Sequence, residues 1–205
     1  SGFTGEGVKV AVIDTGIDYN HPDLKDVYIG GYDFVDNDDD PMETTYEDWK
    51  QSGRPEVYAG NTYYTAHGTH VAGIIAGQGT NETEYAVTGI SPGVDLYGYR
   101  VLGPYGSGMA SHIIAAIDQS VQDEMDIINL SLGANINDPF YPTSIAVNNA
   151  VLAGVTSVVA AGNAGSEMRT LNSPGTSTLA ITVGANNTSI TVPTFNGTIS
   201  GSDAS

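Results

Sequence analysis

Three polar residues of this 205-residue chain stand where their side chains can do chemistry. Asp14 and Asn163 each follow a β-branched apolar run, and His67 opens a segment with helical spacing. A carboxylate, an imidazole and an amide can respectively orient a base, move a proton and stabilise an oxyanion. Simpler interpretations are a turn cap for Asp14, a turn former for Asn163, and a helix-start residue or a zinc ligand with His70 for His67. The chain has no His-Glu-x-x-His motif and no cysteine, which weakens the zinc interpretation.

The segments that must position these side chains alternate in type along the chain. Five apolar runs predict strands, at 8–13, 96–102, 126–132, 156–161 and 179–184. Three stretches between them place apolar residues at helical spacing, at 67–77, 111–121 and 144–153. This alternation predicts a three-layer α/β fold, with a mostly parallel central sheet and helices on both of its faces. The loops after parallel strands gather at one edge, where a ligand site is expected.

Two segments depart from this alternation. Residues 33–64 are polar, acidic and rich in Tyr and Gly, so they are expected to form a long surface excursion. Residues 188–205 are rich in Ser, Thr, Gly and Asn, which is typical of an edge strand or a linker. We therefore expect residues 1–187 to form the N-terminal part of one domain and residues 188–205 to form a polar tail or a boundary.

The composition excludes several classes of function. The chain has 24 Asp and Glu against 6 Lys and Arg, a formal net charge of -18. Such a chain repels phosphate backbones and anionic lipid, so neither nucleic acid nor a membrane surface is expected as a partner. The absence of cysteine excludes disulfides, thiolate metal sites and a cysteine nucleophile. No apolar run reaches the roughly 18–20 residues that a membrane-spanning helix needs.

Four motifs, taken in their order along the chain, resemble the subtilisin-like serine proteases (the subtilase family). They are VIDTGI at 12–17, HGTHVAG at 67–73, NLSLG at 129–133 and AAGN at 160–163. The resemblance extends over about residues 5–184. It implies a serine endopeptidase that is secreted and extracellular and acts through an Asp-His-Ser triad.

The resemblance also implies a role for each polar residue. Asp14 would hold the His67 imidazole in the productive tautomer and stabilise its cation, and His67 would act as general base and then general acid. Asn163 would donate its amide to the oxyanion. Loss of such a donor costs about 10²–10³-fold in turnover, a magnitude known for subtilisin itself.

The expected substrate is a peptide or protein segment in extended conformation, bound as an added strand. Two segments are similar to the walls that pair with the substrate backbone: Gly106, Ser107 and Gly108, and Ser131, Leu132 and Gly133. Three small residues are expected to line the pocket for the residue before the scissile bond: Ala160, Ala161 and Gly162. Small residues there imply a roomy apolar pocket with a preference for large apolar or aromatic side chains.

The nucleophilic serine of the family's Gly-Thr-Ser-x-Ala motif is not found where a helix should begin. Gly175-Thr176-Ser177 imitates the motif, but a strand pattern follows it, so Ser177 is rejected as the nucleophile. Three explanations remain open: a longer enzyme with the serine on a C-terminal remainder, a deliberate truncation of the chain, and a peptide-binding pseudoprotease. The first is favoured, with a protease-associated domain inserted before the serine segment, and the remainder is then a partner of this chain.

The chemistry requires no cofactor, and a structural calcium ion is the metal that the sequence leaves open. The acidic run Asp36–Asp40 suits either a solvated loop or Ca²⁺, but it does not complete an EF-hand. Asp23 matches a calcium ligand of some subtilisin-like enzymes. The loop that would partner it, at 78–88, differs in length and composition from theirs.

Overall fold

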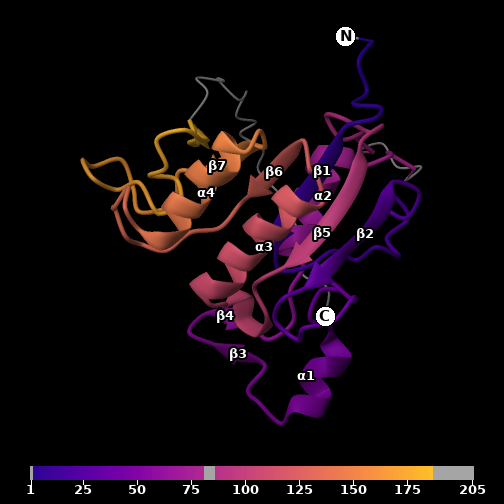
Figure 1. The fold of residues 1–205 in the computed structure, drawn as a ribbon. Helices are drawn as coiled ribbons and strands as arrows, with labels where there is room; N and C mark the ends of the chain where they lie inside the picture. The colour runs from indigo at the N-terminus through magenta and orange to yellow at the C-terminus, as the bar shows by residue number, and fades with distance from the viewer. Residues whose placement is uncertain (1, 81–85, 187–205) are drawn as a thin grey trace, which may run out of the picture.

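The computed structural model describes residues 2–80 and 86–186 of the chain. They form a six-stranded sheet in the order β2-β5-β1-β6-β7-β8, with every neighbouring pair parallel (Figure 1). Its strands are β1 (Lys9–Asp14), β2 (Tyr28–Asp33), β5 (Asp95–Arg100), β6 (Ile127–Leu130), β7 (Thr156–Ala160) and β8 (Ile181–Val183). The helices that pack on it are α2 (His67–Ala76), α3 (Ala110–Gln122) and α4 (Pro142–Leu152).

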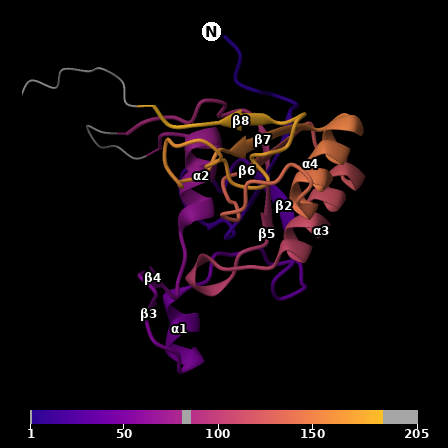
Figure 2. The same cartoon turned by 90° about the vertical axis from the view of Figure 1, so that its left-hand side faces the viewer.

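The sheet lies between two helical layers. Figure 2 shows α2 on one side of the sheet and α3 with α4 on the other. Alternation along β1 supplies both layers with apolar side chains, because Val10 and Val12 pack toward α2 while Ala11 and Ile13 pack toward α3 and α4. All four of these residues are buried. The three-layer α/β architecture predicted from the sequence is confirmed.

Helix α2 covers only part of its face of the sheet. Four residues that are register partners in neighbouring strands point to this face: Val12, Asn129, Val158 and Ile181. Val12 is buried, Asn129 and Val158 are half-buried, and Ile181 is 56% exposed. Within the described residues, the half of this face formed by β6, β7 and β8 is therefore open.

The strand order reverses beside β1. After β1 the chain adds β2 and β5 on one side, and it then adds β6, β7 and β8 on the other. In open parallel sheets the crevice at the carboxyl end of such a switch point is the usual ligand site. Asp14 is the last residue of β1, so it lies at this crevice.

The predicted elements agree closely with the structure. All five predicted strands and all three predicted helices are present, with ends that differ by at most two residues. The edge strand β2 was not predicted, because its sequence YIGGYD contains two glycines and lacks a β-branched run. Gly31 is required there, since a Cβ atom would lie 1.8 Å from the Gly98 carbonyl oxygen of β5.

Residues 45–65 form an arm that projects from the sheet in both views (Figures 1 and 2). The arm contains α1 (Tyr46–Ser52) and a hairpin of β3 (Val57–Tyr58) and β4 (Asn61–Thr62). Thr45 and Asp48 close a capping box at the start of α1. Ala59 and Gly60 both have positive φ, as a two-residue hairpin turn requires.

A buried arginine holds the base of the arm. The Arg100 guanidinium, only 4% exposed, pairs with Asp33 and with Asp36 and donates to the Thr44 hydroxyl at 2.8 Å. The predicted surface excursion is correct for the exposed arm. It is wrong for Glu43 and Thr44, which are buried because bonds to distant residues satisfy their polar groups.

The predicted polar tail, 188–205, and the proposed domain boundary before it lie outside the described residues. Over the part of the chain that is described, no helix has both the length and the apolar character needed to cross a bilayer.

Candidate active site

The Asp14–His67 pair lies at the centre of the crevice. The imidazole Nδ1 of His67 is 2.7 Å from Oδ1 of Asp14. An ionised carboxylate can only accept, so Nδ1 donates and Nε2 is left with a lone pair. Asp14 is 1% exposed, whereas the His67 side chain is 55% exposed. The buried carboxylate thus anchors the imidazole, and Nε2 of the imidazole stays available.

The surroundings of His67 favour its protonated form. The hydrogen bond to Asp14 raises the pKa of His67 above its ordinary value of 6.5, while partial burial acts in the opposite direction. The negative charges of Asp14 and Glu43 raise the pKa further. A basic, oriented imidazole of this kind is suited to accept a proton from a hydroxyl group and to hold it as a cation.

Distant residues, and not a local cap, hold the helix end that carries His67. Ala66 at the N-cap makes no side-chain bond to α2. The Gly68 amide donates to the Thr15 hydroxyl at 2.9 Å, and the Thr69 amide donates to Glu43 at 2.9 Å. These bonds satisfy two of the backbone donors that a helix N-terminus leaves unpaired. They also tie His67 to the turn that follows Asp14.

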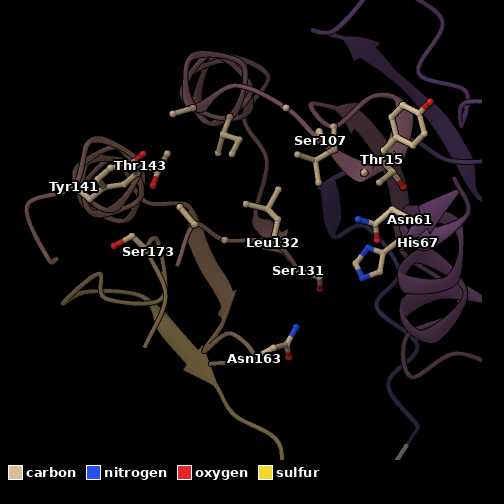
Figure 3. Close-up of a pocket in the computed structure, with 18 residues that line it drawn as sticks. Thr15, Asn61, His67, Ser107, Ser131, Leu132, Tyr141, Thr143, Asn163 and Ser173 are labelled. Atoms are coloured by element: carbon tan, nitrogen blue, oxygen red, sulfur yellow. The ribbon is translucent and has the colours of Figure 1, made fainter. Parts of the chain in front are cut away.

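A cleft of about 720 Å³ opens beside His67 (Figure 3). Figure 3 shows the exposed Asn163 side chain pointing toward the side of the cleft where His67 lies, with Ser131 between the two in this view. The lining contains no Asp, Glu, Lys or Arg; it consists of Thr15, Asn61, His67, Leu102, Tyr105, Gly106, Ser107, Gly108, Ala110, Ile113, Ser131, Leu132, Gly133, Ala134, Tyr141, Thr143, Asn163 and Ser173.

Both predicted walls border this cleft, and the predicted pocket residues do not. Gly106–Gly108 is exposed, with Ser107 in extended conformation, and Ser131–Gly133 faces the same space. The three residues at 160–162 end β7 and precede Asn163 without lining the cleft. There Gly162 packs against Asn172, because a Cβ atom would lie 2.4 Å from the Asn172 Cγ.

Several residues of the site were not predicted from the sequence, and three of them show why. Asn61 of the arm lines the cleft, and so does Tyr105. Tyr105 holds the arm there, because its amide donates to the Tyr63 carbonyl at 3.1 Å. Glu43 supports the helix of His67 from the predicted surface excursion. No pattern in the sequence marks these positions, because each depends on a contact between distant segments.

Ser177 lies away from the cleft. It is 7% exposed, and its hydroxyl donates to the Ser144 carbonyl at 3.0 Å. The described residues place no hydroxyl group in hydrogen-bonding contact with Nε2 of His67.

The acidic residues considered for calcium mostly bond to protein groups. Asp36 pairs with Arg100, Asp38 accepts from the Asp40 amide, and Asp40 accepts from the Tyr19 hydroxyl. Asp23 accepts from the Thr80 amide at 2.7 Å, beside a loop that is only partly described. In the described ranges no three His, Cys, Asp or Glu side chains are grouped as a metal site requires.

Comparison with known proteins identifies the family. The sequence model of the Subtilase family, Peptidase S8, matches residues 5–204. The minor extracellular protease Vpr of Bacillus subtilis is 48% identical over 186 residues, which are 90% of this chain and 21% of Vpr. An intracellular serine protease of Paenibacillus polymyxa is 41% identical, over 89% of this chain and 51% of that protein. The chain thus spans about half or less of the length of these relatives.

The fold agrees with solved structures of the same family. The crystal structure of a cold adapted subtilisin-like serine proteinase superposes with a TM-score of 0.68 at 32% identity, over 91% of this chain and 57% of that one. The matched family model covers nearly the whole chain, and the paired Asp14 and His67 occupy the switch point of the same fold. This chain belongs to the subtilase family of serine proteases.

Proposed function

We propose that the chain supplies the aspartate, the histidine and the oxyanion donor of a serine endopeptidase. The observation that carries the proposal is the 2.7 Å contact between a buried carboxylate and an imidazole whose second nitrogen faces an uncharged cleft. Asp14, His67 and Asn163 take the three roles, and the nucleophilic serine comes from a C-terminal segment outside these 205 residues.

The geometry supports acyl transfer in two proton steps. Nε2 of His67 accepts the serine proton as the hydroxyl oxygen attacks the peptide carbonyl carbon, and Asp14 stabilises the imidazolium that results. The Asn163 amide donates to the carbonyl oxygen as it becomes negative. His67 then returns its proton to the leaving amine, and water repeats the sequence to release the acyl group.

The cleft favours an extended, uncharged stretch of substrate. The segments 106–108 and 131–133 border it on two sides, so a peptide between them adds as a strand through backbone hydrogen bonds. Because its lining has no Asp, Glu, Lys or Arg, binding depends on apolar contact and backbone pairing. We infer a broad endopeptidase that prefers large apolar or aromatic side chains.

The open half of the sheet offers a place for the serine segment. Ile181 and Val183 on β8 are 56% and 53% exposed, and Val158 of β7 is only half-buried. An apolar surface of this kind is covered in a stable domain. A helix that packed there would lie on the same side of the sheet as α2, which carries His67.

Two further parts of the proposal concern metals and location. The chemistry needs no metal, and any Ca²⁺, for example near Asp23, has a structural role. The Bacillus subtilis relative is named an extracellular protease, and this supports secretion. The Paenibacillus polymyxa relative is named an intracellular one, so membership of the family does not decide the location.

A fluorophosphonate probe tests the proposal, because it labels only an activated serine. Intact mass is measured under denaturing conditions before and after labelling, on the protein as isolated from its source. We expect one probe on a polypeptide that includes residues beyond the 205, and no label in the His67→Ala variant. A protein of only the 205-residue mass that binds peptides and takes up no probe would be a peptide-binding module instead.

A further inference from the structure

Glu43 is a buried carboxylate at the N-terminus of α2, next to the Asp14–His67 pair. Its side chain is 6% exposed. Oε1 accepts from the Thr69 amide at 2.9 Å and from the Thr69 hydroxyl at 3.0 Å, and Oε2 accepts from the Thr65 hydroxyl at 2.6 Å. These donors offset the cost of burying the carboxylate. They also fix its position relative to the helix that carries His67.

The segment that contains Glu43 is tied to the rest of the site. The Thr44 amide donates to the Thr65 hydroxyl at 3.1 Å, and the Thr44 hydroxyl accepts from Arg100 at the end of β5. Two residues before Glu43, the Pro41 carbonyl accepts from the Ile17 amide at 2.9 Å, in the turn that follows Asp14. The segment around Glu43 is thus held by bonds to the arm, to the end of β5 and to the turn after Asp14.

A negative charge at this place acts on His67 through the helix end. The N-terminus of a helix stabilises an anion, and the anion in turn stabilises a cation on the first turn. Asp14 is the carboxylate that contacts the imidazole, and Glu43 is the second carboxylate that raises the pKa of His67. The other titratable groups at this end are Asp18, whose amide donates to the Thr69 hydroxyl, and His70 on α2 itself.

We propose that Glu43 is a positioning residue of the protease, which sets both the orientation and the basicity of His67 through α2. The inference rests on the proposed function for its catalytic meaning. Glu43 does not contact the substrate or the reacting atoms. Its hydrogen bonds hold Thr69 and therefore the first turn of α2, while its charge favours the imidazolium that forms as His67 takes the serine proton.

The variant Glu43→Gln separates the charge from the hydrogen bonds. The amide oxygen can still accept from Thr69, and the amide nitrogen can donate to the Thr65 hydroxyl, which is able to reverse its role. The charge is removed, and both contacts can remain hydrogen bonds. Glu47→Gln is the matched control, because Glu47 is an exposed carboxylate of α1 whose ion pair is with Lys50.

Two measurements on the full-length enzyme test the inference. Titration of His67 by NMR, with labelled histidine, is expected to give a lower pKa in Glu43→Gln than in the wild type and in Glu47→Gln. The acidic limb of kcat/KM is expected to move to lower pH. On the plateau kcat falls by roughly two- to tenfold at unchanged KM, because the base is weakened while its whole contribution is about 10²–10⁴-fold.

The outcomes are distinguishable. An unchanged His67 pKa and an unchanged acidic limb in Glu43→Gln overturn the inference, even if the variant is less stable. If Glu43→Gln does not fold, Glu43→Asp is measured instead. Its side chain is one methylene shorter, so the charge lies farther from Thr69, and a wild-type kcat in this variant overturns the inference. If the wild-type enzyme has no activity, the proposed function fails, but the NMR titration still tests the effect of Glu43 on His67.

Discussion

At the scale of single residues, the contact between Asp14 and His67 decides which nitrogen carries the proton. Asp14 is almost fully buried, and its Oδ1 also accepts from the Thr15 amide at 2.7 Å. Its Oδ2 is buried without a partner among the described residues. The carboxylate therefore directs its negative charge at the imidazole, and this fixes the tautomer that leaves Nε2 able to accept.

The variant Asp14→Asn should keep the fold but lose the His67 tautomer that carries its proton on Nδ1. An asparagine amide can donate to Nδ1, which places the imidazole proton on Nε2 and removes the base. We expect kcat to fall by about 10⁴-fold with little change in KM, as for the corresponding change in other triads. Asp39→Asn, which removes an exposed carboxylate, is the control and should retain wild-type rates. A loss below tenfold in Asp14→Asn would contradict the assigned role.

The pH profile of the enzyme should follow His67. Protonated imidazole cannot accept the serine proton, so kcat/KM falls as the pH decreases through the His67 pKa. Because the hydrogen bond to Asp14 raises that pKa, the midpoint is expected above 6.5. The folding contribution has the opposite dependence: it is present below 6.5 and is lost as the pH rises through the raised pKa. A kinetic midpoint below 6.5 for the wild type would exclude His67 as the base with this geometry.

At the scale of elements, α2 is positioned by a close approach of two backbones. A Cβ atom on Gly68 would lie 2.1 Å from the Gly16 carbonyl oxygen, in the turn after β1. Only glycine therefore lets the first turn of α2 approach near enough for the Gly68 amide to reach Thr15. The same glycine brings His67 within reach of Asp14.

The pair Gly68→Ala and Gly73→Ala tests this requirement within one helix. Gly68→Ala should destabilise the enzyme by about 1–3 kcal/mol, because the backbone must shift to remove the clash, and it should lower kcat as His67 moves. A Cβ atom on Gly73 meets nothing within 4 Å, so Gly73→Ala should stabilise the helix by about 0.5–1 kcal/mol. Denaturant unfolding measures both values. Equal effects of the two substitutions would exclude the close approach.

The sequence was informative where local pattern determines structure. The β-branched run before Asp14 and the helical spacing after His67 identify β1 and α2, and the motif order predicts that their polar ends meet. It was uninformative about Glu43, because a carboxylate in a polar segment gains its burial only from Thr65 and Thr69. The strand β2 was not predicted for the same reason. Its glycines are needed for the close approach to β5, and this approach cannot be seen in the sequence of either strand alone.

At the scale of the whole molecule, the two faces of the sheet are unequally covered. Over β6 and β7, helices α3 and α4 bury Leu130 and Val159 to 0% and 1% exposure. On the other face the register partners Val158 and Ile181 remain half-buried and 56% exposed. The net charge of -18 opposes association between copies of the chain, but it does not cover this apolar surface.

The lone chain of residues 1–205 is therefore expected to aggregate or to fold poorly. The variant Ile181→Ser tests whether the open half of the sheet is the cause. In the full-length enzyme this substitution should cost about 2–4 kcal/mol, since the isoleucine is then covered. In the lone chain it should increase the soluble fraction, since it removes exposed apolar surface. Val57→Ser, at a residue equally exposed on the arm, is the control and should leave the stability of the full enzyme unchanged. A sharp two-state melt of the lone wild-type chain would contradict the expectation, because it would mean that the open half of the sheet needs no cover.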